Sequence, residues 1–159
     1  MKTAVPYIIP ALLAVVICYG GVCWAIGITA TGSWSQTIDA SNLTGGAGTD
    51  LNSTYQSASN AVVIDIIGAG STWGVAVKKI TSNWHSSLHL SVKRTSDGTG
   101  VGTISGGTSY QEVTDIDQSF FSGNRSRANV NVQFQLTGVS IQVPPGVYTA
   151  TVYYTVTGT

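Results

Sequence analysis

Two small groups of titratable side chains have a spacing that could support chemistry. His85 and His89 lie four residues apart, so on one strand they would share a face and could hold a metal ion. Asp115 and Asp117 flank Ile116, and such a pair could bind calcium or act as an acid and a base. The sequence implies no third ligand for either group. We therefore expect surface histidines, with His89 on the solvent side of its strand, a solvated carboxylate rim, and no metal.

The motifs of nucleophilic and phosphate chemistry do not occur in this sequence. It contains no Gly-x-Ser-x-Gly elbow and no phosphate-cradling glycine loop that leads into a helix. Arg125 and Arg127 flank Ser126 in a predicted loop, where we expect both guanidinium groups to be solvated. Seven basic residues balance seven acidic ones, which leaves no basic surface for nucleic acid. We predict no catalytic residues, hence no enzyme, no cofactor and no nucleic-acid partner.

Aromatic side chains offer a different chemistry, because their flat faces can stack on sugar rings. The candidates are Trp73, Trp84, Tyr110 and Tyr55. Trp73 alternates with two valines and is expected in the core. Trp84 lies in a turn-like stretch and is the best candidate for an exposed sugar platform, which makes surface glycans an alternative partner. Three N-x-S/T sequons, listed by their asparagines, fall in predicted loops and could carry glycans: Asn42, Asn52 and Asn124.

The N-terminus has the pattern of an export signal. Lys2 precedes an apolar run from Ala11 to Val22, and Cys23-Trp24-Ala25 places small residues at the cleavage positions. We expect a helical signal peptide over 1–25, cleaved after Ala25, with an uncleaved anchor as the alternative. The mature chain would then be secreted to the cell surface, free of the membrane, and without cysteine, since Cys18 and Cys23 leave with the signal.

The remaining chain has the composition and periodicity of a sheet protein. Only 9% of the residues are charged, whereas the chain holds 20 Thr, 18 Ser and 19 Gly. Apolar residues alternate over Trp73–Ile80, Leu88–Val92, Val130–Leu136 and Val147–Thr157. Asp97-Gly98 is a hairpin signal. We predict seven to nine strands in an all-β, immunoglobulin-like antiparallel sandwich over 41–159.

The segment 26–40 has the strongest alternation in the chain. Its even positions are apolar apart from Gln36, which predicts one long strand with a single buried face: Ile26, Ile28, Ala30, Gly32, Trp34 and Ile38. This strand could open the sandwich of its own domain. It could instead complete the sheet of a neighbour, because a sheet edge offers unpaired N–H and C=O groups. Head-to-tail repetition of that contact does not close and builds a filament.

Both ends of the mature chain resemble pilin-like proteins. Ile26–Trp34, with its mid-strand Gly32, looks like the donor strands of chaperone–usher-type pilins. Pro145–Val156 is similar to the closing strand of those pilins and of the spore coat protein U family. The resemblance implies an incomplete immunoglobulin-like sandwich that polymerises at the cell surface by donor-strand exchange, with Ile28, Ala30, Gly32 and Trp34 entering a neighbour's groove. The disulfide of many such pilins is absent from the mature chain.

Two functions follow from these observations. The first is an exported structural subunit of a filament, pilus or coat, whose partners are copies of itself joined through the N-terminal strand. The alternative is a secreted carbohydrate-binding or adhesin module that is complete by itself. The two differ in whether residues 26–38 pair within their own chain or with another.

Overall fold

The computed structural model describes residues 7–11 and 26–158, and in this part of the chain nearly all regular structure is β. The one described helix is a three-residue 3-10 turn, η1, at Ala40–Asn42. The strands are β1 Tyr7–Ala11, β2 Gly27–Gly32, β3 Trp34–Ser35, β4 Tyr55–Gln56, β5 Val62–Ile67, β6 Thr72–Ser82, β7 His89–Arg94, β8 Ile104–Gly106, β9 Gln111–Glu112, β10 Gln118–Asn124, β11 Arg127–Thr137 and β12 Thr149–Gly158. Within the described ranges, no helix has the length and apolar character needed to cross a membrane.

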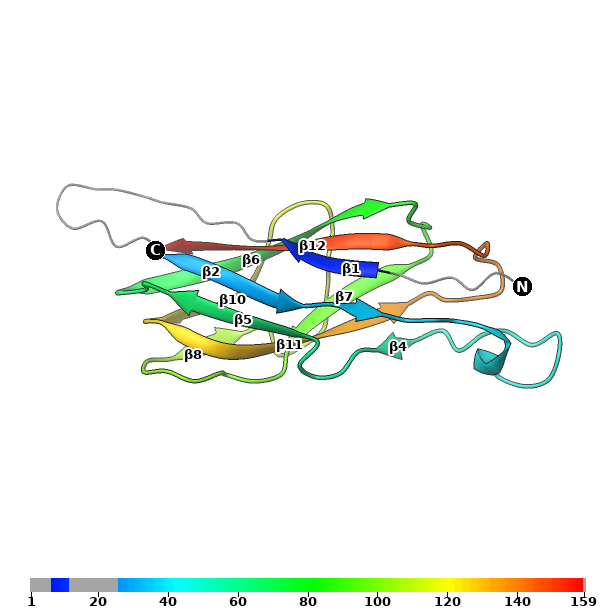
Figure 1. Ribbon diagram of the computed structural model, residues 1–159, viewed down its shortest axis with the longest axis horizontal. Helices are drawn as coiled ribbons and strands as arrows, with labels where there is room; N and C mark the ends of the chain where they lie inside the picture. Colours follow the sequence, from blue (N-terminus) through cyan, green and yellow to red (C-terminus); the bar gives the residue numbers. More distant parts are fainter. Residues whose placement is uncertain (1–6, 12–25, 159) are drawn as a thin grey trace.

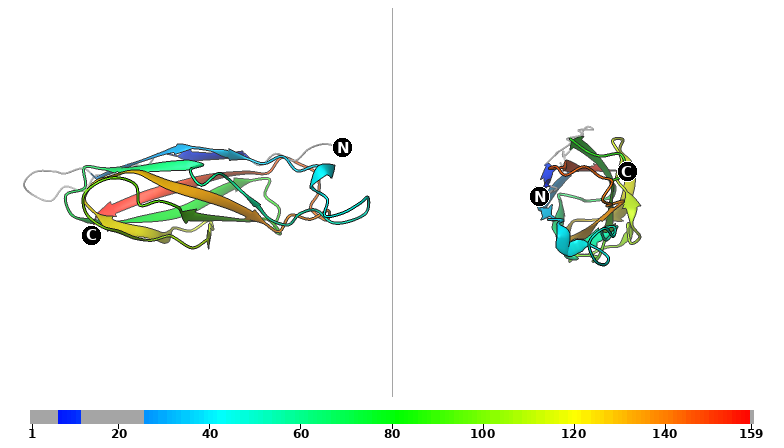
Figure 2. Two further views of the ribbon diagram at one scale, coloured as in Figure 1. Left: turned by 90° about the horizontal axis from the view of Figure 1, so that it is seen from below. Right: turned by 90° about the vertical axis from the view of Figure 1, so that its right-hand side faces the viewer.

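The strands form two six-stranded sheets that lie face to face (Figures 1 and 2). One sheet has the order β3-β1-β12-β6-β10-β8. The other has the order β2-β5-β11-β7-β9, with β4 also paired to β11. Every described pair is antiparallel except β1 with β12. The prediction of an all-β sandwich with antiparallel sheets is therefore confirmed.

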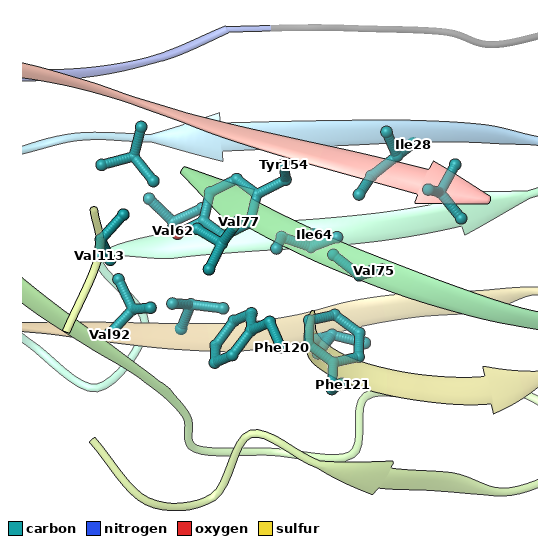
Figure 3. Packing of buried hydrophobic residues seen from close by; sticks show 14 of the residues in the cluster. Ile28, Val62, Ile64, Val75, Val77, Val92, Val113, Phe120, Phe121 and Tyr154 are labelled. Carbon is teal, nitrogen blue, oxygen red and sulfur yellow. The ribbon is translucent and has the colours of Figure 1, made fainter. Parts of the chain in front are cut away.

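The core between the sheets follows from the period-two pattern of the long strands. Successive side chains of a strand point to opposite faces, so one alternate set from each strand is buried. On β6 this set is Trp73, Val75 and Val77, and β7, β11 and β12 follow the same rule. Figure 3 shows part of this core between the two sheets, with Tyr154 of β12 extending toward Val62 and Val77.

The prediction of one continuous strand over Ile26–Ile38 is wrong. β2 ends at Gly32, whose φ is +129°, and the chain then moves to the opposite sheet as β3. A Cβ at position 32 would lie 2.1 Å from the carbonyl oxygen of Ala61, so only glycine fits this crossing. The alternation is nevertheless real, since Ile28 is buried and Trp34 packs against the core.

Two further local predictions are corrected by the structure. Asp97-Gly98 does not join two paired strands, because β7 pairs with β11 and β9 while the next strand, β8, pairs with β10. Instead, Thr99 forms an isolated bridge to Ala128, which fixes the loop after β7 against β11. The helix expected over 1–25 is contradicted at Tyr7–Ala11, which form a strand, and the rest of 1–25 lies outside the described residues. Export and cleavage of this segment stay predictions.

Candidate functional site

The side of β12 that faces away from β6 is the candidate site, and we refer to it as the β12 edge. Toward β6, β12 is paired along its whole length, from Thr149 opposite Ser82 to Gly158 opposite Trp73. On the β12 edge the partner is β1, which runs parallel from Tyr7 opposite Thr149 to Ala11 opposite Tyr153. β3 in turn pairs with the outer side of β1 at Tyr7 and Ile8. β1 is thus inserted between β12 and β3 (Figure 1).

The occupant of the β12 edge comes from the segment that the sequence predicts to be removed. Among the described residues, β1 is the sole strand partner of both β3 and the β12 edge. A domain without residues 1–25 would leave a row of main-chain N–H and C=O groups open on β12. Such groups need a partner, and an exposed edge is a template for another strand.

The β12 edge borders the centre of the core rather than its margin. The inward side chains of β12 are Ala150, Val152, Tyr154 and Val156, and each is at most 1% exposed. A strand that joins this edge therefore places its alternate side chains against an apolar interior. Main-chain pairing and side-chain burial would act together there, which is the usual basis of strand addition.

The Tyr154 hydroxyl is the one polar group within this stretch of core. Tyr154 is 1% exposed, and its hydroxyl oxygen has no hydrogen-bond partner among the described residues. Burial raises the pKa of this hydroxyl far above its ordinary value. Its ring lies 6.3 Å from that of Phe120, between centroids, and serves as core packing (Figure 3).

The six residues predicted as a polymerisation strand lie in their own domain. β2 pairs antiparallel with β5 of the same chain, from Gly27 opposite Ile67 to Gly32 opposite Val62. Ile28 is buried in the core, and Ile26 and Ala30 pack against it. Trp34 stacks on Phe134, with 6.2 Å between the two ring centroids. Ile38 packs against a smaller apolar cluster around Leu136.

Trp84, the predicted sugar platform, is half-buried rather than fully exposed. Its indole N–H donates to the carbonyl oxygen of Leu88 at 2.7 Å. The Lys79 ammonium lies 5.2 Å from the centre of the ring and covers one face. Partial burial lowers the pKa of Lys79, and the nearby carboxylates of Glu112 and Asp115 act in the opposite direction. Sugar binding at Trp84 stays a prediction.

The histidine and aspartate groups do not come together as a site. His89 is on the solvent side, as predicted, and its Nδ1 lies 2.7 Å from Oε1 of Glu112. His85 accepts a hydrogen bond from the main-chain N–H of Ser87 before the next strand begins. Asp117 pairs with Lys78 at 2.8 Å. No cluster of three potential metal ligands exists among the residues that the structure describes.

Two buried arginines were missed by the reading of the sequence. Arg127 is 8% exposed and donates to the carbonyl oxygen of Gly102, so the expectation that it is solvated is wrong. Arg94 is 5% exposed; it donates to the carbonyl oxygens of Gly106 and Ser96 and pairs with Asp97. Both guanidinium groups hold the loop between β7 and β8. The carbonyl oxygens of Gly106 and Gly102 lie 12 and 25 residues from Arg94 and Arg127, respectively, and such distant partners leave no local signal in the sequence.

The comparison with known proteins does not assign a family. No protein-family model matches the chain, and no curated protein matches it in sequence. The β12 edge is therefore the feature of this chain that indicates a function.

Proposed function

We propose that the mature chain is an exported structural subunit of a cell-surface filament, pilus or coat, whose subunits join by β-strand addition. The observation that carries this proposal is the β12 edge. Its occupant, β1, belongs to the segment that bears the export signal in our reading of the sequence. Removal of that segment would leave a sandwich one strand short, and a strand from another copy could complete it.

The strand order supports an immunoglobulin-like sandwich that lacks its last strand. In that fold the strands A, B, E and D form one sheet, and C, F and G form the other. The order β2-β5-β11-β7 matches A-B-E-D, and the neighbours β6 and β12 match C and F. The place of strand G, beside β12, is taken by β1 from the opposite end of the chain. β1 runs parallel to β12, whereas a G strand runs antiparallel to F.

The donor that we propose is the N-terminal strand of a neighbouring copy, Ile26–Ile38. This segment is longer than β1 and contains no proline. At about 3.3 Å per residue, its thirteen residues could cover all ten residues of β12. To be donated, β2 has to leave β5 of its own chain, so exchange is favoured only if pairing on the β12 edge outweighs that loss. The exposed loop after Asp39 offers the slack for such a movement.

A disulfide that locks β2 in place tests this donor. The background replaces Cys18 and Cys23 with serine, and the lock is Thr29→Cys with Asp65→Cys, two residues that face each other across β2 and β5. We expect the exported, reduced protein to form heat-dissociable ladders on detergent gels, and the oxidised protein to stay monomeric. The control pair, Lys93→Cys with Gln133→Cys, joins β7 to β11 and should not affect assembly.

Two outcomes would contradict the proposal in different ways. Ladders that form equally well with β2 locked would show that the donor is another strand. A reduced, exported protein that stays monomeric at every concentration would show that the chain is not a self-assembling subunit.

A second function, a self-contained adhesin or carbohydrate-binding module, is favoured by one observation. β2, which the first function makes the donor, pairs with β5 of its own chain, so the secreted chain can keep its N-terminal strand within its own sandwich. Under this proposal the secreted protein is a monomer that binds surface glycans. Retention on immobilised glycans that is lost in Trp84→Ala, together with the absence of ladders, would favour this function over the first.

A further inference from the structure

We infer that Tyr7–Ala11 is an intramolecular plug, which keeps the β12 edge closed in the full-length chain until cleavage and release open it. The inference rests on the proposed function and adds its regulation. Cleavage is hydrolysis of the peptide bond after Ala25, which takes up one water molecule and leaves a new amine and a new carboxylate. Only after this step can the plug leave and a second copy take its place.

The plug fits the edge but covers only half of it. β12 has ten paired residues on the β6 side, from Thr149 to Gly158. On the β12 edge β1 pairs only from Thr149 to Tyr153. Within the described part of the chain, Tyr154–Gly158 have no strand partner on that side. A longer strand that ran the whole edge would make more main-chain hydrogen bonds than the plug.

The plug also pairs more weakly than its length suggests. Pro10 stands opposite Val152 and has no main-chain N–H, so it donates no hydrogen bond on either side of β1. The contact with β3 is limited to Tyr7 and Ile8. Parallel pairing is slightly less stable per residue than antiparallel pairing. While β1 is covalently attached, its effective concentration at the β12 edge is high, so it competes well with a strand from another copy. Once it is cut free, that advantage is lost and it competes poorly.

The same segment therefore has two consequences for assembly. While attached, β1 satisfies the edge groups of β12 and shields a core-lining edge from other chains. After cleavage it becomes a short peptide that dilutes away. Premature assembly before export would be suppressed without a separate covering protein, and cleavage would set the time at which strand addition begins.

A register-specific disulfide tests the plug in the intact chain. The variant carries Ile9→Cys and Thr151→Cys, two positions that are in register across β1 and β12, in the background without Cys18 and Cys23. A protease recognition sequence is inserted after residue 18. We expect the disulfide to form in the folded full-length chain. The control, Ile9→Cys with Thr157→Cys, is out of register by six residues and should not form it.

Cutting the chain at the inserted site then tests whether release of the plug allows assembly. With the disulfide intact, the cut protein should remain monomeric and keep the plug by mass. After reduction, the plug should dissociate, and the main-chain amides of Thr149–Tyr153 that point to β1 should exchange about tenfold faster or more in the monomer that forms first. These amides should become protected again as the protein assembles.

The two proposals fail in different ways in this experiment. If the pair at 9 and 151 does not cross-link in a chain where the pair at 29 and 65 does, the plug inference is overturned and the proposed function is untouched. If the plug pairs and is released as expected but the cut protein stays monomeric, the plug stands and the subunit function is overturned.

Discussion

At the scale of single residues, the core beside the β12 edge is apolar apart from the Tyr154 hydroxyl. This group is buried without a hydrogen-bond partner among the described residues. Leaving a buried donor unpaired costs about 1–3 kcal/mol. The ring of Tyr154 fills space next to Phe120, so its size is needed while its oxygen is not.

Tyr154→Phe should therefore stabilise the protein. We expect the free energy of unfolding to rise by about 1 kcal/mol, because the substitution removes the unpaired donor and keeps the ring. The matched control is Tyr153→Phe on the outer face of β12, which should change stability by less than about 0.5 kcal/mol. Urea unfolding followed by tryptophan fluorescence measures both. A loss of stability in Tyr154→Phe would mean that the hydroxyl has a partner in the folded chain.

At the scale of elements, Gly32 allows the N-terminal strand to move from one sheet to the other. Its positive φ and its contact with the carbonyl of Ala61 both exclude a side chain. Gly32→Ala should lower the free energy of unfolding by about 1–3 kcal/mol, and hydrogen exchange in β2 should speed up. Gly74→Ala is the control, because a Cβ there meets nothing within 4 Å and φ is not positive. Equal stability of the two variants would contradict this explanation of the crossing.

Asp50 connects two loops at the end of the sandwich. Its carboxylate accepts hydrogen bonds from the main-chain N–H groups of Ile141 at 2.8 Å and Leu51 at 2.7 Å, and from the Ser140 hydroxyl. These bonds, led by that from Ile141, hold the pKa of Asp50 below its ordinary value of 3.8. The loop before β4 is thereby fastened to the segment between β11 and β12.

The lowered pKa predicts how acid affects this connection. A carboxylate whose folded-state pKa is depressed stabilises the fold above its unfolded value, and the contribution disappears as the pH falls through the folded value. Asp50→Asn should therefore lower the melting temperature at pH 7, and its difference from the unaltered protein should shrink below about pH 4. Thermal unfolding between pH 7 and pH 2 measures it. A difference that is independent of pH would contradict the role of the charge.

At the scale of the whole molecule, local patterns predicted the strands better than they predicted their partners. The alternation over β6, β7, β11 and β12 follows from one buried face, which is a property of neighbouring residues. The burial of Arg94 and Arg127 depends on carbonyl groups of a separate loop and could not be read from the sequence.

The candidate site was the least predictable part of the molecule. The apolar residues before Ala25 have the composition of an export signal, and the same residues include the strand that fills the β12 edge. Strand pairing between the two ends of the chain leaves no trace in residue spacing. The sequence directed attention to Ile26–Ile38 as a donor, whereas the structure adds an acceptor edge and the strand that occupies it.

The most direct test of the β12 edge as a site of strand addition is the mass of the folded protein before and after residues 1–25 are cut away. Sedimentation at several concentrations follows the oligomeric state, and hydrogen exchange follows the β12 amides that point away from β6. We predict a monomer with protected β12 amides for the intact chain, and concentration-dependent oligomers with those amides protected again for the cut chain. A cut chain that stays monomeric while its β12 amides exchange freely would contradict the account.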